Sequence, residues 1–304
     1  MGRVVEIADP LVSLSLNRGF MKISVDKIDK AQIPISDIDI LILNGTGATL
    51  TTSLLNELLE NGAMVLVLGK NYSPSGIFYP TDPHHLHKQK INLQINASKP
   101  LNKRLWQAIV KAKIINQAKI LSFFSNEEEK QLIELSKKVS SGDPENIEAQ
   151  AAKKYWQKLF GKDFRRDYSS IGINSLLNYG YAILRSSTAR AVLACGLNPT
   201  LGVHHHNMEN AFCLVDDLME PYRPIVDFVV KRISEKNPEI KELTSEHKKK
   251  LAKILQIQIS LNSETTSLSN SIMKLCQSFV NSLEKGEENL QFPLSPLPIE
   301  FEII

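Results

Sequence analysis

The stretch YPTDPHHLH, residues 79–87, divides this 304-residue chain into two parts with different hydrophobic patterns. Before it lie short runs of β-branched, aliphatic and aromatic residues, most of them bounded by Asp, Asn, Gly or Pro, which predict strands. After it nearly every apolar pattern has the period of a helix. A run of strands followed by a run of helices indicates an α+β protein.

The first part, residues 1–80, is expected to form a small β-rich domain, a sheet with one covering helix. The expected strands are residues 4–7, 11–16, 21–25, 38–43, 64–68 and 76–79. One helix interrupts the strands, and Gly62 follows it as a C-cap. The apolar stripe of that helix contains Leu50, Leu54, Leu55, Leu58 and Leu59.

The second part is expected to be all-α and to carry the chemistry. Residues 81–95, which follow Pro80 and contain Pro83, are expected to be a linker, and residues 96–304 a helical catalytic domain. Apolar stripes at residues 173–184 and 268–283 each lie on one helical face. The tail, residues 292–304, contains three prolines and cannot continue the preceding helix.

Composition narrows the class of protein. Hydrophobic residues make up 42% and charged residues 23%, which is ordinary for a globular chain. No apolar run reaches the ~18–20 residues of a membrane-spanning helix, and Arg3, Glu6 and Asp9 interrupt any secretory signal. The three cysteines form neither a disulfide framework nor a zinc motif, so a location in a reducing cytoplasm is expected.

Positive charge is concentrated just after the boundary. Residues 83–126 contain eight Lys or Arg but no Asp or Glu. This predicts a surface that faces a polyanion such as DNA, with Lys103, Arg104 and Lys111 as contacts. A second basic cluster ends in Arg165 and Arg166. The alternative is a solvated helix face.

Three histidines lie at the boundary itself, at His84, His85 and His87. We interpret them as part of a boundary loop or as phosphate contacts. The alternative is a metal site, but a helical pair and nearby Cys ligands are lacking, and Asp82 is the only carboxylate close by.

A first candidate site residue lies in DPENIEAQAAKKYW, residues 143–156. Asp143 and Pro144 predict a helix N-cap and first position, with Glu148 in the second turn. Ala152, Tyr155 and Leu159 continue the face of Glu148, so the carboxylate is partly buried if that face packs inward. A buried carboxylate requires a partner or a metal; the alternative is an exposed acid favoured by the helix dipole.

The second candidate segment is GLNPTLGVHHHNMENAFCLVDDLMEPYRPIVD, residues 196–227. His204, His205 and His206 follow a turn-rich loop, and a predicted helix then carries Asp217 and Glu220 before two prolines. A histidine facing two carboxylates is a mixed nitrogen and oxygen ligand set, which suits Mn²⁺ as well as Mg²⁺. The alternative is a structural histidine triplet with surface acids.

Between these segments, a polar stripe runs along one face of a predicted helix. Its members are Asn174, Asn178, Tyr181 and Arg185. Such side chains contact phosphates and sugars. They also make ordinary interhelical hydrogen bonds, and that alternative stays open.

The order of these motifs resembles the CRISPR-associated adaptation integrase family, whose members insert spacers into CRISPR arrays. The resemblance rests on the helix-start Glu before AQAAKKY, on NSLLNYGY, on GLNPTLG with a histidine three residues later, and on DLMEPYRPIVD. It extends over essentially the whole chain and is most similar to members that accompany type II systems.

The resemblance implies that Glu148, His205 and Glu220 are the catalytic residues and the ligands of a divalent metal, Mg²⁺ or Mn²⁺. Asp217 matches a further carboxylate that some members use. Two positions depart from the family pattern: Ala149 stands where Gly is frequent, and Glu220 where many members have Asp.

The resemblance also implies the reaction and the partners. The reaction is metal-assisted cleavage and strand transfer on DNA, in which a 3′-hydroxyl attacks a phosphodiester without ATP. The partners are double-stranded and branched DNA, a second copy joined through residues 1–80, a small ferredoxin-like adaptation subunit, and other type II CRISPR proteins. The rival hypotheses are a DNA-binding scaffold without catalysis and a generic metal-dependent phosphohydrolase.

Overall fold

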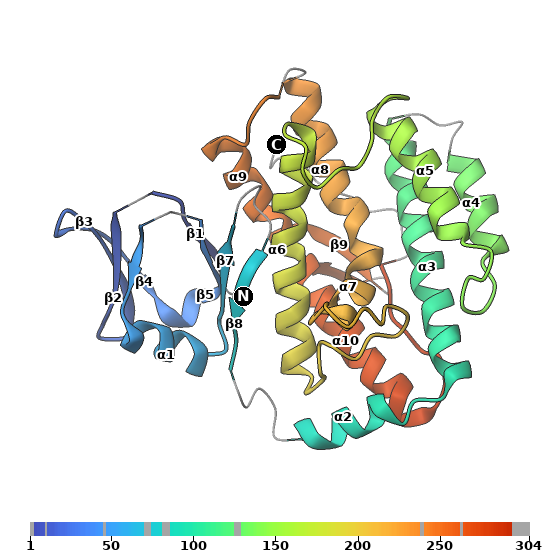
Figure 1. Cartoon of the computed structure of the whole chain (residues 1–304), viewed down its shortest axis with the longest axis horizontal. Coiled ribbons are helices and arrows are strands. Elements are labelled where there is room, and N and C mark those ends of the chain that lie inside the picture. Colours follow the sequence, from blue (N-terminus) through green and yellow to red (C-terminus); the bar gives the residue numbers. More distant parts are fainter. Residues whose placement is uncertain are drawn as a thin grey trace. The chain divides into compact units, whose positions relative to one another are not determined.

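A computed structural model of the chain describes residues 3–9, 11–44, 47–69, 74–80, 86–124, 129–237, 240–261 and 264–293. The chain forms two compact units, residues 1–83 and residues 84–304. Figure 1 shows the elements of each unit, β-rich in the first and helical in the second.

The first sheet of the N-terminal unit has the order β1-β5-β7-β8. Strands β1 (Arg3–Ile7), β5 (Ile38–Leu43) and β7 (Met64–Leu68) run parallel, and β8 (Pro74–Phe78) pairs antiparallel to β7. The central strand β7 is a continuous apolar run and β5 is interrupted only by Asp39, as is typical of parallel strands covered on both faces.

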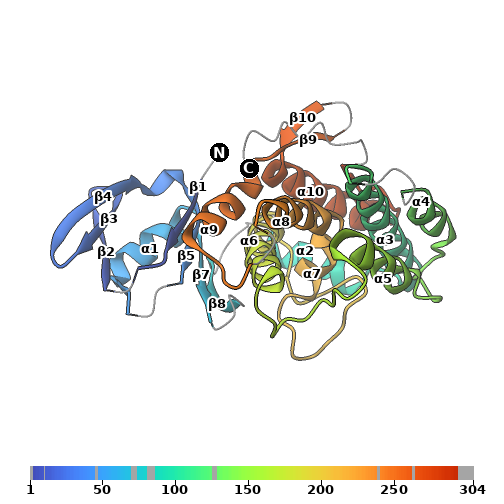
Figure 2. The same cartoon turned by 90° about the horizontal axis from the view of Figure 1, so that it is seen from above.

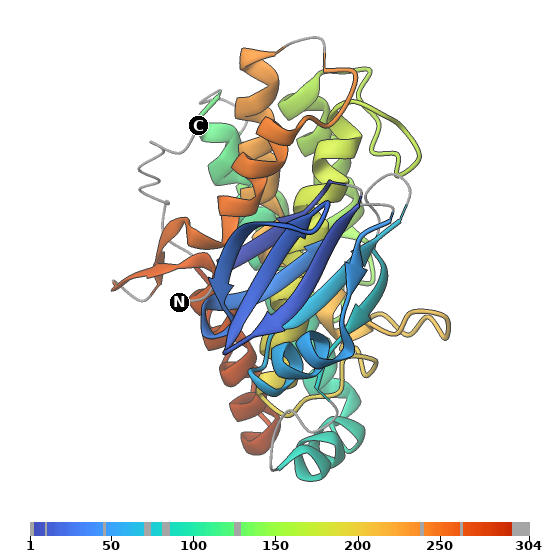
Figure 3. The same cartoon turned by 90° about the vertical axis from the view of Figure 1, so that its left-hand side faces the viewer.

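A second sheet, which the sequence did not predict as separate, has the order β4-β3-β2-β6. Its strands are β2 (Val12–Asn17), β3 (Phe20–Val25), β4 (Ile28–Pro34) and β6 (Thr49–Leu50). The single sheet expected was therefore wrong. Strand β4 was missed because most of its side chains are exposed, so it shows no alternation of apolar and polar residues. Figure 3 shows the strands of this unit from the side.

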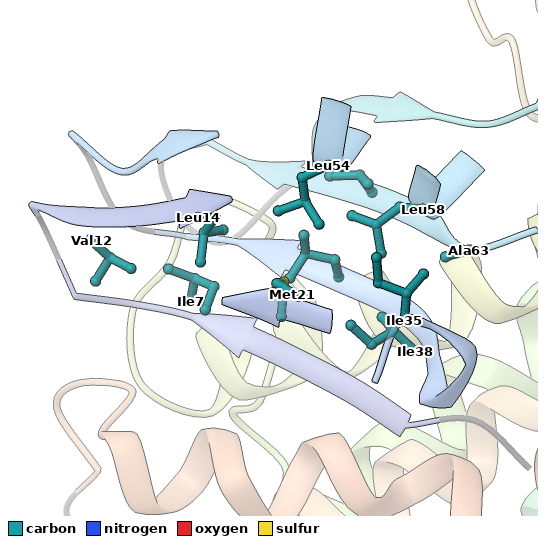
Figure 4. Close-up of a cluster of buried hydrophobic side chains, with 11 residues drawn as sticks. Ile7, Val12, Leu14, Met21, Ile35, Ile38, Leu54, Leu58 and Ala63 are labelled. Carbon is teal, nitrogen blue, oxygen red and sulfur yellow. The ribbon is translucent and has the colours of Figure 1, made fainter. Parts of the chain in front are cut away.

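The one helix of this unit, α1 (Thr52–Glu60), begins and ends as its sequence indicates. The Thr51 hydroxyl accepts a hydrogen bond from the Leu54 amide at 3.4 Å, and Gly62 follows the helix with a φ of +73°. Leu54 and Leu58 of α1 pack with Met21 and Ile38 in a buried apolar cluster (Figure 4). This cluster is the core of the unit.

Nine α-helices are described in the second unit, and α3 and α6 organise them (Figures 1 and 2). Helix α6 packs against α7, α8, α9 and α10, while α3 packs against α4, α5 and α8. Their bounds are α2 (His87–Ile95), α3 (Lys99–Ser122), α4 (Glu129–Lys138), α5 (Ile147–Phe160), α6 (Ile173–Ala194), α7 (Cys213–Met219), α8 (Arg223–Lys236), α9 (Ser245–Ala252) and α10 (Leu268–Lys285).

Two features of this unit differ from the sequence prediction. Helix α2 occupies most of the expected linker, residues 81–95, because buried Lys90 anchors it to Glu284 of α10 at 2.5 Å. The unit is also not all-α, since β9 (Gln258–Leu261) and β10 (Glu264–Ser267) pair antiparallel. Four-residue strands are too short for their alternation to be distinguished from a loop.

Two predicted features lie outside the described residues: His84 and His85 at the boundary, and residues 294–304 of the Pro-rich tail. His87, the third boundary histidine, begins α2 and donates from Nδ1 to the Gly196 carbonyl at 3.0 Å. In the part of the chain that the structure describes, no helix has the length and apolar character needed to cross a membrane.

Candidate active site

Two of the predicted site carboxylates converge on one buried lysine. The Lys113 ammonium on α3 lies 2.5 Å from Glu148 Oε1 and 2.6 Å from Glu220 Oε2. The three side chains come from three separate elements: α3, α5 and the 3-10 helix η3 (Glu220–Tyr222). Lys113 and Glu220 are buried, and Glu148 is partly exposed.

Glu148 is held at the start of α5 by a double cap. The Asp143 carboxylate accepts the amides of Ile147 at 2.9 Å and Glu148 at 3.0 Å, and the Asn146 side chain accepts a third amide. The helix therefore begins at Ile147, later than predicted, and Glu148 lies in its first turn rather than its second. The first turn places this carboxylate at the positive end of the helix dipole.

Glu220 is positioned by a change of helix type. Helix α7 ends at Met219, η3 follows, and α8 begins at Arg223, as the two prolines of this segment predicted. Asn116 of α3 donates to the Pro221 carbonyl at 2.8 Å, which fixes η3 against α3. Arg223 lies 3.0 Å from Glu220 Oε1, so this carboxylate contacts two cations.

The mutual attraction of these charges exceeds the cost of burying them. Burial alone would lower the pKa of Lys113, but the Glu220 and Glu148 carboxylates outweigh it and the pKa is raised. Burial alone would likewise raise the pKa of Glu220, but Arg223 and Lys113 lower it. Lys113 and Glu220 therefore each keep their charge in spite of burial.

Sequence reasoning counted Lys113 only as one of eight basic residues in the acid-free segment. A signal was present, because Trp106, Ile109 and Lys113 follow one another at helical spacings on the buried face of α3. A lysine within an apolar stripe requires an acidic partner, and this one has two.

The histidine loop is held by Asp217, which is fully buried. Its Oδ2 accepts the Val203 amide at 2.7 Å and the His204 amide at 2.9 Å, and His205 Nδ1 donates to Oδ1 at 2.5 Å. Any side chain at Gly202 would collide with the His205 carbonyl and approach Asp217 Oδ2 to 3.0 Å. Asp217 therefore positions the loop, and the Nε2 lone pair of His205 remains for a proton or a metal.

Trp106 packs against the same loop from α3. Its ring stacks on the His204 ring with centroids 4.2 Å apart and planes 3° apart, and it meets the His205 ring edge-on at 5.5 Å. The hydrogen bond to Asp217 raises the pKa of His205, whereas burial and then the charge of His205 lower the pKa of His204. The two neighbouring histidines thus have different environments.

The donor chemistry of Glu148, Glu220 and His205 fits a divalent ion. Among the described residues, however, no three or more His, Cys, Asp or Glu side chains form a group that could hold a metal. The Lys113 ammonium instead lies between the two carboxylates. Glu220 Oε2 is buried without a well-directed hydrogen bond although Lys113 is 2.6 Å away, so this oxygen retains a lone pair for a cation.

The polar stripe of α6 is directed inward. Asn178 and Tyr181 are buried; Asn178 accepts from Arg166 Nη2 at 2.6 Å, and the Tyr181 hydroxyl donates to Asp227. Arg166 also donates to Asn174 at 2.9 Å. Of the two interpretations left open, this geometry is that of internal hydrogen bonds: Tyr181 bonds to α8, and the two asparagines bond to Arg166 in the loop before α6.

The remaining predicted DNA contacts differ in exposure. Arg185 is engaged with Asp216 at 2.6 and 2.8 Å, within the helical unit. Lys103 and Arg104 on α3 and Arg165 after α5 are exposed, and Lys111 is half-buried. Among the described residues, these four form no side-chain ion pair, and Arg104 donates to the Gly286 carbonyl at 3.3 Å.

Comparison with solved structures defines the class of the fold. The structure matches a casposase bound to its integration product with a TM-score of 0.81, at 21% identity and over 99% of this chain and 95% of that chain. It matches a Cas1 protein from Thermotoga maritima with a TM-score of 0.76, at 18% identity and over 95% of this chain and 99% of that chain. The fold is therefore that of the class that contains casposases and Cas1 proteins.

Sequence comparison specifies the family within this class. The model of the family "CRISPR associated protein Cas1" matches residues 6–266. A CRISPR-associated endonuclease Cas1 from Neisseria meningitidis is 38% identical over 263 residues, which is 86% of each chain. A Cas1 endonuclease from Pyrobaculum aerophilum is 26% identical over 84% of this chain and 90% of the relative. The chain belongs to the Cas1 family, as the motif resemblance implied.

Proposed function

We propose that Glu148, His205 and Glu220 form the metal-dependent centre of this Cas1 protein, an endonuclease and integrase of CRISPR adaptation. The observation that carries the proposal is the convergence of Glu148 and Glu220 on one cation position, at 2.5 and 2.6 Å from Lys113 Nζ. The histidine loop, held by Asp217, supplies a nitrogen ligand beside them.

Each residue has a separate task in this proposal. Glu148 and Glu220 would hold Mg²⁺ or Mn²⁺ through carboxylate oxygens, and His205 through Nε2. The ion supplies Lewis-acid stabilisation of the oxygens that become negative during phosphoryl transfer. Asp217 keeps the proton of His205 on Nδ1 and orients the ring, while Arg223 keeps Glu220 ionised.

The reaction that we propose is transesterification. A DNA 3′-hydroxyl attacks a phosphodiester of the CRISPR repeat, a new P–O bond forms, and the bond to the leaving 3′-oxygen breaks. Bond energy is conserved, so ATP is not needed. Attack by water in the same position would give cleavage.

An integration assay with a defined repeat tests the proposal. The protein should join branched DNA with a free 3′-hydroxyl to the repeat in Mn²⁺, lose this activity in EDTA, and leave small phosphate esters intact. Equal hydrolysis of small esters would instead indicate a generic phosphohydrolase. DNA binding without any strand transfer in Mn²⁺ would indicate a scaffold.

We further propose that two copies act together through the N-terminal unit, because an integration event joins two DNA ends and one chain supplies one Glu148 and Glu220 pair. Ile28 and Phe20, on adjoining strands of the second sheet, are exposed apolar residues that a partner copy would cover. Light scattering tests this: a mass near one chain, 34.1 kDa, at micromolar concentration would contradict the dimer.

The wider assembly is proposed from the relatives. Structures similar in fold are titled as Cas6-RT-Cas1–Cas2 complexes, one with a TM-score of 0.77 at 18% identity. We propose that a small ferredoxin-like subunit bridges two dimers of this chain, and that branched DNA binds along α3. The family motifs of this sequence are most similar to those of members that accompany type II systems, so we also propose type II CRISPR proteins as partners and the prokaryotic cytoplasm as the location.

A further inference from the structure

A basic pocket lies beside the histidine loop and is not used by the proposed centre. It has a volume of about 410 Å³, within the ~300–1,000 Å³ range of ligand sites. Its walls come from the first turns of α3, the turn before α5 and the histidine loop. The lining residues are Lys99, Asn102, Lys103, Trp106, Gly142, Val203, His204 and His206.

The charge of this pocket is positive throughout. No Asp or Glu lines it, and neither Lys99 nor Lys103 forms an ion pair with any described residue. The Lys103 stem is held by Gly142, whose amide donates to the Lys103 carbonyl at 3.0 Å and where a Cβ would lie 3.1 Å from Lys103 Cγ. The Lys103 stem therefore packs beside Gly142, while its exposed ammonium is available to an anionic ligand.

One wall of the pocket is a supported aromatic ring. Buried Trp106 covers one face of the His204 imidazole in a parallel stack at 4.2 Å, yet His204 is exposed and lines the pocket. His204 and Trp106 thus form this wall together, and the exposed surface of His204 is accessible to a ligand. A flat ring fixed from behind is a suitable platform for a nucleobase, because every base has a π-face.

We propose that this pocket binds one nucleotide of single-stranded DNA, with its base stacked on His204 and its phosphate beside Lys103 and Lys99. This inference rests on the proposed function and adds a subsite to the same centre. His205 follows His204 directly in the chain and faces Asp217 and the carboxylate pair, so a strand held in the pocket passes next to the reacting phosphodiester. Stacking carries no base identity, so the subsite should accept all four bases.

An abasic scan tests the subsite without any chemistry. A labelled branched duplex with a single-stranded 3′ arm is bound by the full-length protein in EDTA, and an abasic residue is moved along the arm one position at a time. We expect one position at which the abasic residue weakens binding about tenfold. His204→Ala should weaken intact DNA similarly and lose the abasic effect, whereas His204→Phe, which keeps a flat ring, should retain both affinity and effect.

The cation contacts have a matched control. Lys99→Gln with Lys103→Gln should weaken binding and reduce its salt dependence, whereas Lys249→Gln, an exposed lysine on α9, should not. Tryptophan fluorescence gives a second signal, because in a Trp156→Phe background Trp106 is the only tryptophan. Its emission should change when intact DNA binds. The emission should not change when the bound DNA carries the abasic residue at the sensitive position.

The outcomes separate this subsite from the proposed centre. An abasic scan that is flat in the wild type, or identical in the wild type and His204→Ala, would overturn the subsite. Glu148→Gln should lose strand transfer but keep the abasic effect. If Glu148→Gln stays fully active, the proposed centre fails, and the scan then decides the subsite by itself.

Discussion

The helical unit contains two clusters of buried ionisable side chains. They differ in whether the buried groups keep their charge. Around Lys113, one ammonium contacts two carboxylates, and the opposite charges raise the pKa of Lys113 and lower the pKa of Glu220. Around Asp227, a buried carboxyl receives a hydrogen bond from the Tyr181 hydroxyl, and burial raises the pKa of Asp227 to about 7. The first cluster keeps its charge and the second can lose it.

The difference shows how direct contact with an opposite charge changes the pKa of a buried carboxyl group. Glu220 touches Lys113 and Arg223 directly, so its pKa is lowered in spite of burial. Asp227 accepts hydrogen bonds from hydroxyl groups and has no ion pair with Arg223, whose charge acts on it only at a distance. The effect of burial is therefore the largest, and the pKa of Asp227 is raised. Of the two clusters, only the first has carboxylates whose protein cation could be replaced by a divalent ion.

The largest effect expected from this comparison concerns catalysis. Metal-dependent strand transfer should fall by more than ~100-fold in each of the variants Glu148→Gln, Glu220→Gln and His205→Ala. This exceeds the loss caused by removing a residue that only hydrogen-bonds to a metal ligand. Circular dichroism should show an intact helical fold. A different histidine would be the ligand if His205→Ala stayed fully active. In that case His204→Ala or His206→Ala should bind DNA but fail to transfer strands.

The next effect concerns the cation of the first cluster. Lys113→Met removes the ammonium that Glu148 and buried Glu220 share and leaves Arg223 as the remaining cation at Glu220. Breaking this buried contact should lower the free energy of unfolding by about 3 kcal/mol in EDTA. Mn²⁺ should restore more stability to this variant than to the wild type, because a bound cation replaces the ammonium. Urea unfolding measures both, with Lys111→Met on the same helix as the control. A Lys113→Met protein as stable as that control would contradict the shared-cation interpretation.

The second cluster should make stability depend on pH. The pKa of Asp227 is about 7 in the folded protein against an ordinary value of 3.8, so the folded state binds more protons between these values. Stability should therefore fall as pH rises from about 4 to about 7, by at most about 4 kcal/mol, and remain low above that range. Urea unfolding across this range should show a flatter profile for Asp227→Asn. Identical pH profiles for the two proteins would mean that Asp227 is ionised throughout.

The smallest effect concerns cations outside both clusters. Replacing Lys103, Arg104 and Lys111 together by Gln should weaken duplex binding with little sequence preference. The salt slope should become shallower by about 0.9 for each DNA phosphate that the variant no longer neutralises. Binding at several salt concentrations measures this, with Lys249→Gln as the control. An unchanged slope would show that the exposed side of α3 is only a solvated face.

Local patterns were sufficient for much of the fold. Helix α10 and the change of helix type at Glu220 follow from apolar spacing and from proline, which act within a few residues. Strand β4 and the hairpin of β9 and β10 were missed because a polar edge strand and four-residue strands have no strong period.

The candidate site, like the fold, was predicted from the sequence only in part. Motif order singled out Glu148, His205 and Glu220, and the structure brings the first and last of these onto one ammonium, while their role as ligands stays a prediction. The α6 stripe was equally visible, yet periodicity alone could not decide whether Tyr181 faces DNA or Asp227. The answer depends on α8, which is distant in sequence from Asn174 and Asn178.

The sequence by itself determined the division into a β-rich and a helical part, the main helices and the family motifs, because these are expressed in spacing along the chain. Only the tertiary structure decided that Lys113 joins the two carboxylates, that Asp217 hydrogen-bonds to the His205 loop, and that Trp106 stacks on His204. The physical reason is that the energy of a buried charge or ring depends on what touches it, and those partners come from other elements of the fold.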